Sequence, residues 1–220
     1  MTFLPAIEQE TRDNPDASVI WLHGLGADGH DFAPIVPELG LPKDLGVRFI
    51  FPHAPAIPVT VNNGYVMPAW FDILEMDIDR KVDTAQLLLS AAAINRLLGR
   101  ELERGIDSRR IILVGFSQGG AVAYQVSLSH PQPLGGLIAM STYFATSDTI
   151  QLSEANRALP IEIHHGSFDP VVPQALGIRA AEVLKDHGYT VAFRTYPMDH
   201  SVCPQQIADI SAALQRFLGR

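Results

Sequence analysis

The sequence is poor in cysteine and in basic residues. Its 220 residues include one cysteine, Cys203, which excludes an internal disulfide and a multi-cysteine metal site and fits a reducing compartment. Sixteen Lys and Arg residues stand against 24 Asp and Glu residues, for a net charge of −8. That charge gives no electrostatic support for binding a nucleic-acid backbone, so nucleic acid is not an expected partner.

Long apolar runs are also absent. No stretch approaches the ~18 consecutive apolar residues of a membrane-spanning helix. Residues 1–16 lack the basic start and apolar run of a signal peptide. We therefore expect a cytoplasmic protein without stable membrane insertion. Hydrophobic residues at 47% and charged residues at 18% are typical of a globular protein, and the length predicts one domain over residues 1–220.

Apolar strand patterns alternate with helical patterns along the chain. The predicted strands are 17–24, 47–52, 110–116, 134–141, 161–166 and 191–196. The predicted helices are 31–39 with Asp31 as its N-cap, 79 to about 104, 118–129, one between the last two strands, and one at the end of the chain. The proline-rich stretch 53–73 shows neither the strand nor the helical spacing of apolar residues, which predicts a long surface excursion. The alternation predicts an α/β fold, with a mostly parallel sheet and helices on both faces.

Residues 115–119 read Gly-Phe-Ser-Gln-Gly, where a predicted strand passes into a predicted helix. G-x-S-x-G is the nucleophile-elbow pattern of α/β-hydrolases. A serine raised above the sheet needs a strained turn that crowds the residues two before and two after it, so both must lack a side chain. We expect Gly120 to let the helix pack close to the strand. We therefore predict Ser117 as a nucleophile; the alternative is a glycine-rich turn that cradles phosphate.

A nucleophilic serine needs a base, and the base needs a carboxylate that orients it. His200 follows the last predicted strand at the edge where ligands bind. Asp169 follows the strand before it, whereas Asp199 is adjacent to His200 and its side chain is expected to point away from the imidazole. His53 lies at the same edge but precedes the serine in the chain. The order Ser117, Asp169, His200 is that of α/β-hydrolases.

An oxyanion hole also requires backbone N–H groups near the serine. We predict Gln118, directly after the serine, and Leu25, in the loop after the first predicted strand, as donors. The same loop spells G-x-G-x-x-G with glycines at 24, 26 and 29, a dinucleotide fingerprint. The next strand ends without the acidic residue that would hold a ribose, so this alternative is rejected.

Several segments together resemble the carboxylesterase / acyl-protein thioesterase family, also called phospholipase/carboxylesterases. They are WLHGLGADG, VMPAWFDI, RIILVGFSQGGAV, HGSFDPVVP and MDHSV, and the resemblance runs from about residue 17 to 218. It implies a small α/β-hydrolase without a cap domain that cleaves acyl esters, with thioesters left open. It also implies that the excursion forms an acyl pocket with Met67, Trp70 and Phe71. One departure is Asp199, where relatives often have glycine.

The sequence therefore predicts a serine carboxylesterase acting on short to medium acyl chains through an acyl-enzyme. No cofactor and no metal is expected, and the expected partner is a small acyl ester substrate, with a homodimer left open. Two alternatives remain. One is a non-catalytic ligand-binding protein on the same fold, and the other is a dedicated acyl-protein thioesterase or lysophospholipase.

Overall fold

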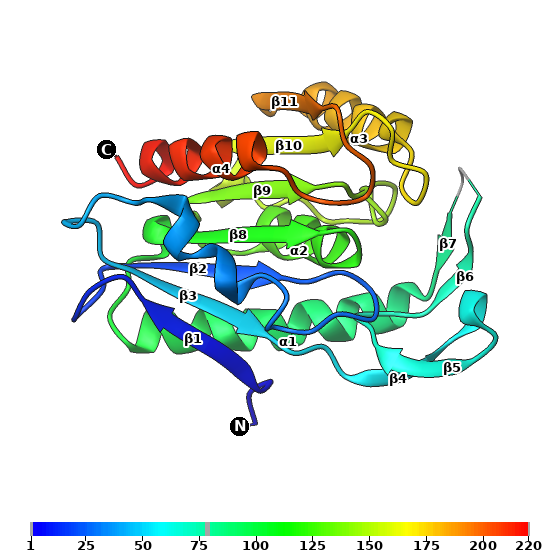
Figure 1. The fold of residues 1–220 in the computed structure, drawn as a ribbon, viewed down its shortest axis with the longest axis horizontal. Coiled ribbons are helices and arrows are strands. Elements are labelled where there is room, and N and C mark those ends of the chain that lie inside the picture. The colour runs from blue at the N-terminus through cyan, green and yellow to red at the C-terminus, as the bar shows by residue number, and fades with distance from the viewer. Residues whose placement is uncertain (1, 78–79, 220) are drawn as a thin grey trace.

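A central sheet organises the molecule, for which a computed structural model describes residues 2–77 and 80–219. Within these residues the sheet has seven strands in the order β1-β3-β2-β8-β9-β10-β11 (Figure 1). The strands are β1 (Ala6–Glu10), β2 (Ala17–Leu22), β3 (Val47–Pro52), β8 (Ile111–Phe116), β9 (Gly136–Met140), β10 (Ile161–Gly166) and β11 (Val191–Tyr196). β1 pairs antiparallel with β3, and the other neighbouring pairs are parallel. The predicted, mostly parallel sheet is confirmed.

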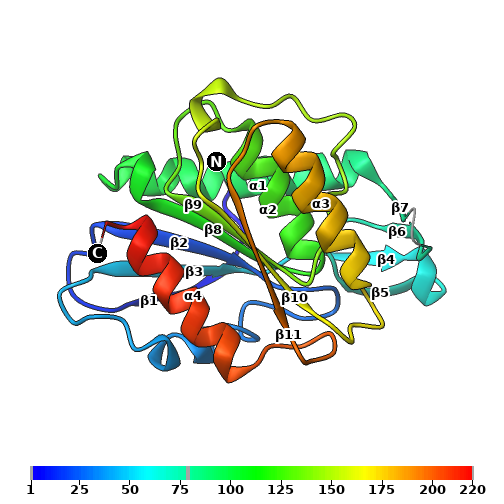
Figure 2. The ribbon, with the colours of Figure 1, turned by 90° about the horizontal axis from the view of Figure 1, so that it is seen from above.

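Helices cover both faces of this sheet (Figure 2). On one face lie α1 (Thr84–Glu103), α2 (Gln118–Ser129) and α3 (Gln174–Asp186); on the other lie α4 (Pro204–Phe217) and the 3₁₀ helices η1 (Ala33–Ile35) and η2 (Pro37–Leu39). Every residue of β2, β8, β9 and β10 is buried. A parallel strand between two helical layers has no face toward water, which explains the continuous apolar runs in the sequence.

α1 begins later than the sequence predicted. Asp83 is its N-cap, with a side-chain carboxylate that accepts a hydrogen bond from the Gln86 backbone N–H at 3.0 Å. Residues 81–82 are extended and form the short strand β7 (Lys81–Val82). The predicted start, Asp79, lies outside the described residues.

The segment 31–39, predicted as one helix capped by Asp31, forms η1 and η2 instead. Phe32 precedes η1, and no side chain caps it. Pro34 and Pro37 lack the N–H groups that a continuous α-helix would need, so only short i to i+3 turns form. The prediction of a single helix was wrong because it gave too little weight to these prolines.

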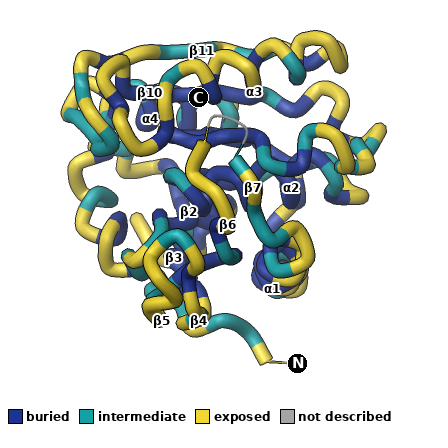
Figure 3. Tube along the Cα trace, turned by 90° about the vertical axis from the view of Figure 1, so that its right-hand side faces the viewer, coloured by how far each residue is buried: buried dark blue, intermediate teal, exposed yellow. Residues whose placement is uncertain are grey.

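The excursion 53–73 contains regular structure that the sequence pattern did not predict. β4 (Ala56–Val59) pairs with β5 (Tyr65–Pro68), and β6 (Ile73–Glu75) pairs with β7. Both hairpins project from the same end of the molecule, and Figure 3 shows most of their residues as exposed or half-buried. Apart from Val59 and Ile73, which are 0% and 3% exposed, the residues of these strands are not buried, so the strands show no apolar alternation. β1 was missed for a similar reason, because it is a half-buried edge strand of mixed polarity.

The parallel strands place the chemistry-bearing loops together. β2, β3, β8, β10 and β11 run the same way, so the loops after them meet at one edge of the sheet.

The helices in residues 2–77 and 80–219 include none with the length and apolar character of a membrane-spanning segment.

The close packing of this edge predicts different effects for two glycine substitutions. A Cβ on Gly119 would lie 2.5 Å from the Leu22 carbonyl oxygen, whereas a Cβ on Gly99 in α1 would meet no atom within 4 Å. Gly119→Ala should therefore lower the free energy of unfolding by about 1–3 kcal/mol. Gly99→Ala should raise it by about 0.5–1 kcal/mol, because alanine restricts the unfolded chain. Urea unfolding measures both, and equal effects would contradict the packing argument.

Candidate active site

Ser117 lies in the turn between β8 and α2 with φ +54° and ψ −122°, a strained conformation for a residue with a side chain. The predicted crowding around it is confirmed. A Cβ on Gly115 would lie 2.5 Å from the carbonyl oxygen of Gly119. The glycine spacing thus lets the turn close tightly and leaves Ser117 half-buried at the sheet edge.

Thr142, after β9, supports this turn from the neighbouring strand. Its Oγ1 donates a hydrogen bond to the Ser117 carbonyl oxygen at 2.6 Å. The Ser117 N–H donates to the carbonyl oxygen of Met140, at the end of β9, at 2.9 Å. A Cβ on Gly120 would lie 2.5 Å from Thr142 Cγ2. Gly120 therefore makes room for Thr142. Its Cα also lies close to β8, because a Cβ on Gly115 would be 2.6 Å away from it, as the predicted close packing of helix and strand requires. Sequence reasoning did not single out Thr142, because it lies 25 residues from Ser117 along the chain.

Asp169 and His200 are joined by a hydrogen bond of 2.7 Å between Asp169 Oδ2 and His200 Nδ1. The other carboxylate oxygen accepts the N–H groups of Val171 at 2.9 Å and Val172 at 2.8 Å. Burial alone would raise the pKa of Asp169, but the hydrogen bonds from His200 and the two backbone N–H groups outweigh it. The pKa of Asp169 therefore lies below its usual value, and the carboxylate stays charged.

His200 lies next to the serine turn. Its ring centroid is 4.7 Å from that of Phe116, the residue directly before Ser117. Asp199, the alternative acid, has an exposed side chain, whereas Asp169 is buried and bonded to His200. The structure thus brings the predicted serine, acid and histidine to one edge.

His165, inside β10, helps to position the Asp169 carboxylate through Val172. It is fully buried, and its Nε2–H donates to the Val172 carbonyl oxygen at 2.8 Å, while Val172 itself holds Asp169. Burial lowers the pKa of His165, although its bond to Val172 opposes the shift, so a neutral ring is favoured. A Cβ on Gly177 in α3 would collide with this ring. No role in the site was predicted for this histidine from the sequence.

The loop after β2, predicted to supply an oxyanion donor, passes directly beside the serine. A Cβ on Gly24 would lie 3.3 Å from the Cβ of Ser117, and Leu25 follows it. The Gly26 N–H donates to the Pro68 carbonyl oxygen at 2.8 Å, which fastens the loop to β5. The loop leads into 3₁₀ turns, not into the α-helix that a dinucleotide phosphate would need.

His23, at the start of this loop, is buried and bonded at both ring nitrogens. Its Nε2 accepts the Ala54 N–H at 3.1 Å, and its Nδ1 lies 2.7 Å from the Gly24 carbonyl oxygen. Burial lowers its pKa, despite the contact with Gly24. His23 therefore ties the loops after β2 and β3 together.

Two residues expected in the acyl pocket lie in the core instead. Trp70 and Phe71 are 1% and 0% exposed. The Gln118 side chain fixes their backbone, since its Oε1 accepts the Trp70 N–H at 3.0 Å and its Nε2 donates to the Phe71 carbonyl oxygen at 2.6 Å. The Trp70 indole N–H donates to the His23 carbonyl oxygen at 2.8 Å. Direct substrate contact by Trp70 and Phe71 stays a prediction, one that their burial disfavours.

Met67 is the remaining member of the expected pocket. It is half-buried on β5, and its Sδ lies 3.8 Å from the position of a Cβ on Gly26 in the loop after β2. Met67 thus borders the predicted oxyanion loop.

Comparisons with known proteins identify the family and agree with the fold. The sequence model of the Phospholipase/Carboxylesterase family matches residues 5–218. Acyl-protein thioesterase 1 of Gibberella zeae is 40% identical over 97% of this chain and 94% of its own length, and that of Neurospora crassa is 40% identical over 98% and 90%. Among solved structures, Arabidopsis thaliana SOBER1 has a TM-score of 0.87 at 31% identity, covering 92% of this chain and 99% of its own. Zea mays acyl-protein thioesterase 2 has a TM-score of 0.86 at 25% identity, covering 99% and 100%.

The lowered pKa of Asp169 predicts a pH-dependent contribution to stability. At neutral pH, Asp169→Asn should lower the free energy of unfolding by about 1.5–3 kcal/mol, the range for hydrogen bonds to charged groups. The contribution is fully present above the unfolded-state pKa of about 4 and is lost as the pH falls through the lower folded-state pKa. The difference between wild type and variant should therefore shrink in acid. Urea unfolding at several pH values measures it.

Asp199→Asn is the matched control for this measurement. Its side chain is exposed, so the variant should stay within about 0.5 kcal/mol of wild type at every pH. A difference for Asp169→Asn that did not change with pH would contradict the assignment of a charged Asp169.

Proposed function

Since the chain belongs to the phospholipase/carboxylesterase family, we propose that it is a serine hydrolase. It cleaves carboxylic esters and thioesters of short to medium acyl chains, and the whole chain acts as one catalytic domain. The observation that carries this proposal is the 2.7 Å hydrogen bond between Asp169 and His200 at the sheet edge that holds the strained Ser117. This combination supplies a nucleophile, a base and an orienting anion.

In the first step, Ser117 Oγ attacks the acyl carbonyl carbon. The hydroxyl proton passes to Nε2 of His200, because Nδ1 of that ring is held by Asp169. The charged carboxylate of Asp169 fixes the ring orientation and stabilises the imidazolium that forms.

The negative charge on the acyl oxygen is held by the backbone N–H groups of Leu25 and Gln118. Support for this comes from the loop after β2, whose Gly24 lies against Ser117. Such preorganised donors stabilise the transition state because they need no reorganisation as charge develops.

Collapse of this intermediate breaks the bond to the leaving group, an alcohol or a thiol. The leaving oxygen or sulfur takes the proton from His200, and an acyl-Ser117 ester remains. Water then attacks the acyl carbon with His200 again as base, which releases the acid and restores the serine. Thioesters suit this chemistry as well as oxygen esters do, and the names of the fungal relatives favour an acyl thioester on a protein.

Labelling by a fluorophosphonate tests the nucleophile, because an activated serine attacks phosphorus as it attacks a carbonyl. Wild type should be labelled at Ser117, and Ser117→Ala should not be labelled. Asp169→Asn should label far more slowly, since the equivalent change costs about 10⁴-fold in kcat in serine proteases. Asp199→Asn should label at the wild-type rate.

Folded wild type that resists the label would favour the non-catalytic binding protein instead. Slow labelling of Asp199→Asn with normal labelling of Asp169→Asn would reverse the choice of acid.

Acyl-chain length tests the substrate class. Each methylene buried against an apolar wall contributes up to about 0.8 kcal/mol, so kcat/KM should climb from acetyl to medium chains and then level. Met67→Ala should flatten the climb and spare acetyl esters, because Met67 borders the loop after β2. Trp70→Ala should instead lower stability by about 3–5 kcal/mol, as expected for a buried aromatic. The measurement is kcat/KM over matched p-nitrophenyl esters and thioesters.

Equal losses at every chain length in a stably folded Met67→Ala would exclude Met67 from the pocket. A strong preference for thioesters across the series would favour the dedicated acyl-protein thioesterase.

A further inference from the structure

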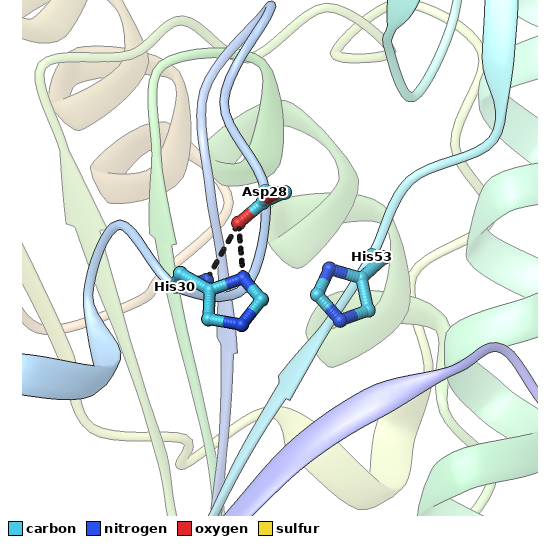
Figure 4. A group of neighbouring side chains, drawn as sticks. All are labelled: Asp28, His30 and His53. Atoms are coloured by element: carbon cyan, nitrogen blue, oxygen red, sulfur yellow. Dashed lines mark hydrogen bonds and ion pairs between the residues drawn. The ribbon is translucent and has the colours of Figure 1, made fainter.

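A second group of chemically active side chains lies outside the catalytic residues. Asp28 and His30 are on the loop after β2, and His53 directly follows β3, whereas the catalytic residues follow β8, β10 and β11. One ligand atom from each of the three side chains lies within 4.8 Å of the other two. Figure 4 shows the two imidazole rings side by side, with the Asp28 carboxylate at one end of the gap between them.

Gly29 allows this approach. A Cβ at this position would collide with the Phe51 carbonyl oxygen and would lie 3.3 Å from Cε1 of His53. Only glycine therefore lets the loop after β2 lie against the end of β3. The His30 and His53 ring centroids are 5.5 Å apart as a result.

Hydrogen bonds already orient the three side chains. Asp28 Oδ1 accepts the His30 backbone N–H at 2.7 Å and lies 2.9 Å from His30 Nδ1. The Gly29 N–H donates to His53 Nδ1 at 3.1 Å, which orients this ring toward the loop. The lone pair of Nδ1 is used in this bond, so a metal ion bound there replaces the Gly29 N–H. An unprotonated imidazole nitrogen is the form that coordinates a metal ion.

We propose that Asp28, His30 and His53 bind one divalent transition-metal ion of the Zn²⁺ type. Zn²⁺ takes imidazole nitrogens and carboxylate oxygens at about 2.0–2.2 Å, which places neighbouring ligand atoms roughly 3–3.5 Å apart. The 2.9 Å separation of Asp28 Oδ1 and His30 Nδ1 is close to this range, whereas the ligand atom of His53, within 4.8 Å of the other two, must move closer to bind the ion. Two nitrogen donors favour Zn²⁺, Ni²⁺, Co²⁺ or Cu²⁺ over Mg²⁺ and Ca²⁺.

Binding places the metal ion between Asp28 and His30, and the N–H proton of the neutral His30 ring moves from Nδ1 to Nε2. The side chains of Asp28 and His30 are 47% and 75% exposed, so the ion has direct access from solvent. The bound ion links the loop that carries Leu25 to the end of β3. An ion that binds only the folded chain raises its stability by mass action, so the melting temperature rises with Zn²⁺ concentration.

Calorimetric titration of the chelator-treated full chain with ZnCl₂ tests the site, with Co²⁺ absorption as a second reading. Wild type should bind one ion and show the visible spectrum of Co²⁺ bound to nitrogen. His30→Gln and His53→Gln should each weaken Zn²⁺ binding at least about 10-fold, because loss of an outer-shell partner alone costs 10–100-fold. Asp28→Asn should do the same, while its amide oxygen still accepts the His30 N–H and preserves the turn.

Two control variants separate this site from other histidines. His187→Gln removes an exposed histidine at the end of α3 and should leave Zn²⁺ binding unchanged. His200→Ala removes the catalytic histidine and should also leave it unchanged. Melting curves without metal confirm that each variant is folded.

The proposal is overturned if wild type binds no Zn²⁺ in the titration. It is equally overturned if folded Asp28→Asn, His30→Gln and His53→Gln all bind as tightly as wild type, or if binding disappears only in His200→Ala. None of these outcomes depends on esterase activity, so the metal site and the proposed function fail separately.

Discussion

The close approach of two backbone segments, the turn that holds Ser117 and the loop after β2, is the constraint on which the rest of the site depends. A Cβ on Gly119 would lie within 2.6 Å of the carbonyl oxygens of Leu22 and His23, and a Cβ on Gly24 would lie 3.3 Å from the Cβ of Ser117. Because the contacts of Gly119 exclude a side chain and those of Gly24 leave little room for one, the serine and the proposed oxyanion donors are brought together by the main chain. Their separation therefore does not depend on flexible side chains.

Gln118 extends this constraint to the excursion 53–73. Its backbone follows the serine, while its buried amide bonds the backbone of Trp70 and Phe71. The Trp70 indole bonds the His23 carbonyl in turn. Three segments that are distant in sequence thus share one hydrogen-bonded network. The network gives the buried Trp70 indole N–H a hydrogen-bond partner, which a buried tryptophan usually needs.

The sequence by itself predicted the parts that follow from local patterns. The strands expected at 47–52, 161–166 and 191–196 coincide with β3, β10 and β11, because β-branched and aromatic residues recur in each of these short segments. The glycine spacing around Ser117 marked a strained turn, since a side chain two residues away would meet the main chain. The positions of Asp169 and His200 after the last two predicted strands then allowed them to be chosen from several acids and histidines.

Only the tertiary structure decided which side chains meet across the chain. Trp70 was expected at a substrate surface and lies in the core. His165, for which no role was predicted, donates to the loop that holds Asp169. The meeting of His30 and His53 likewise follows from the packing of two separate loops. Periodicity in a sequence reports local conformation and the burial of one face. Contacts between distant segments depend on how those faces pack, and that is determined only when the whole sheet has formed.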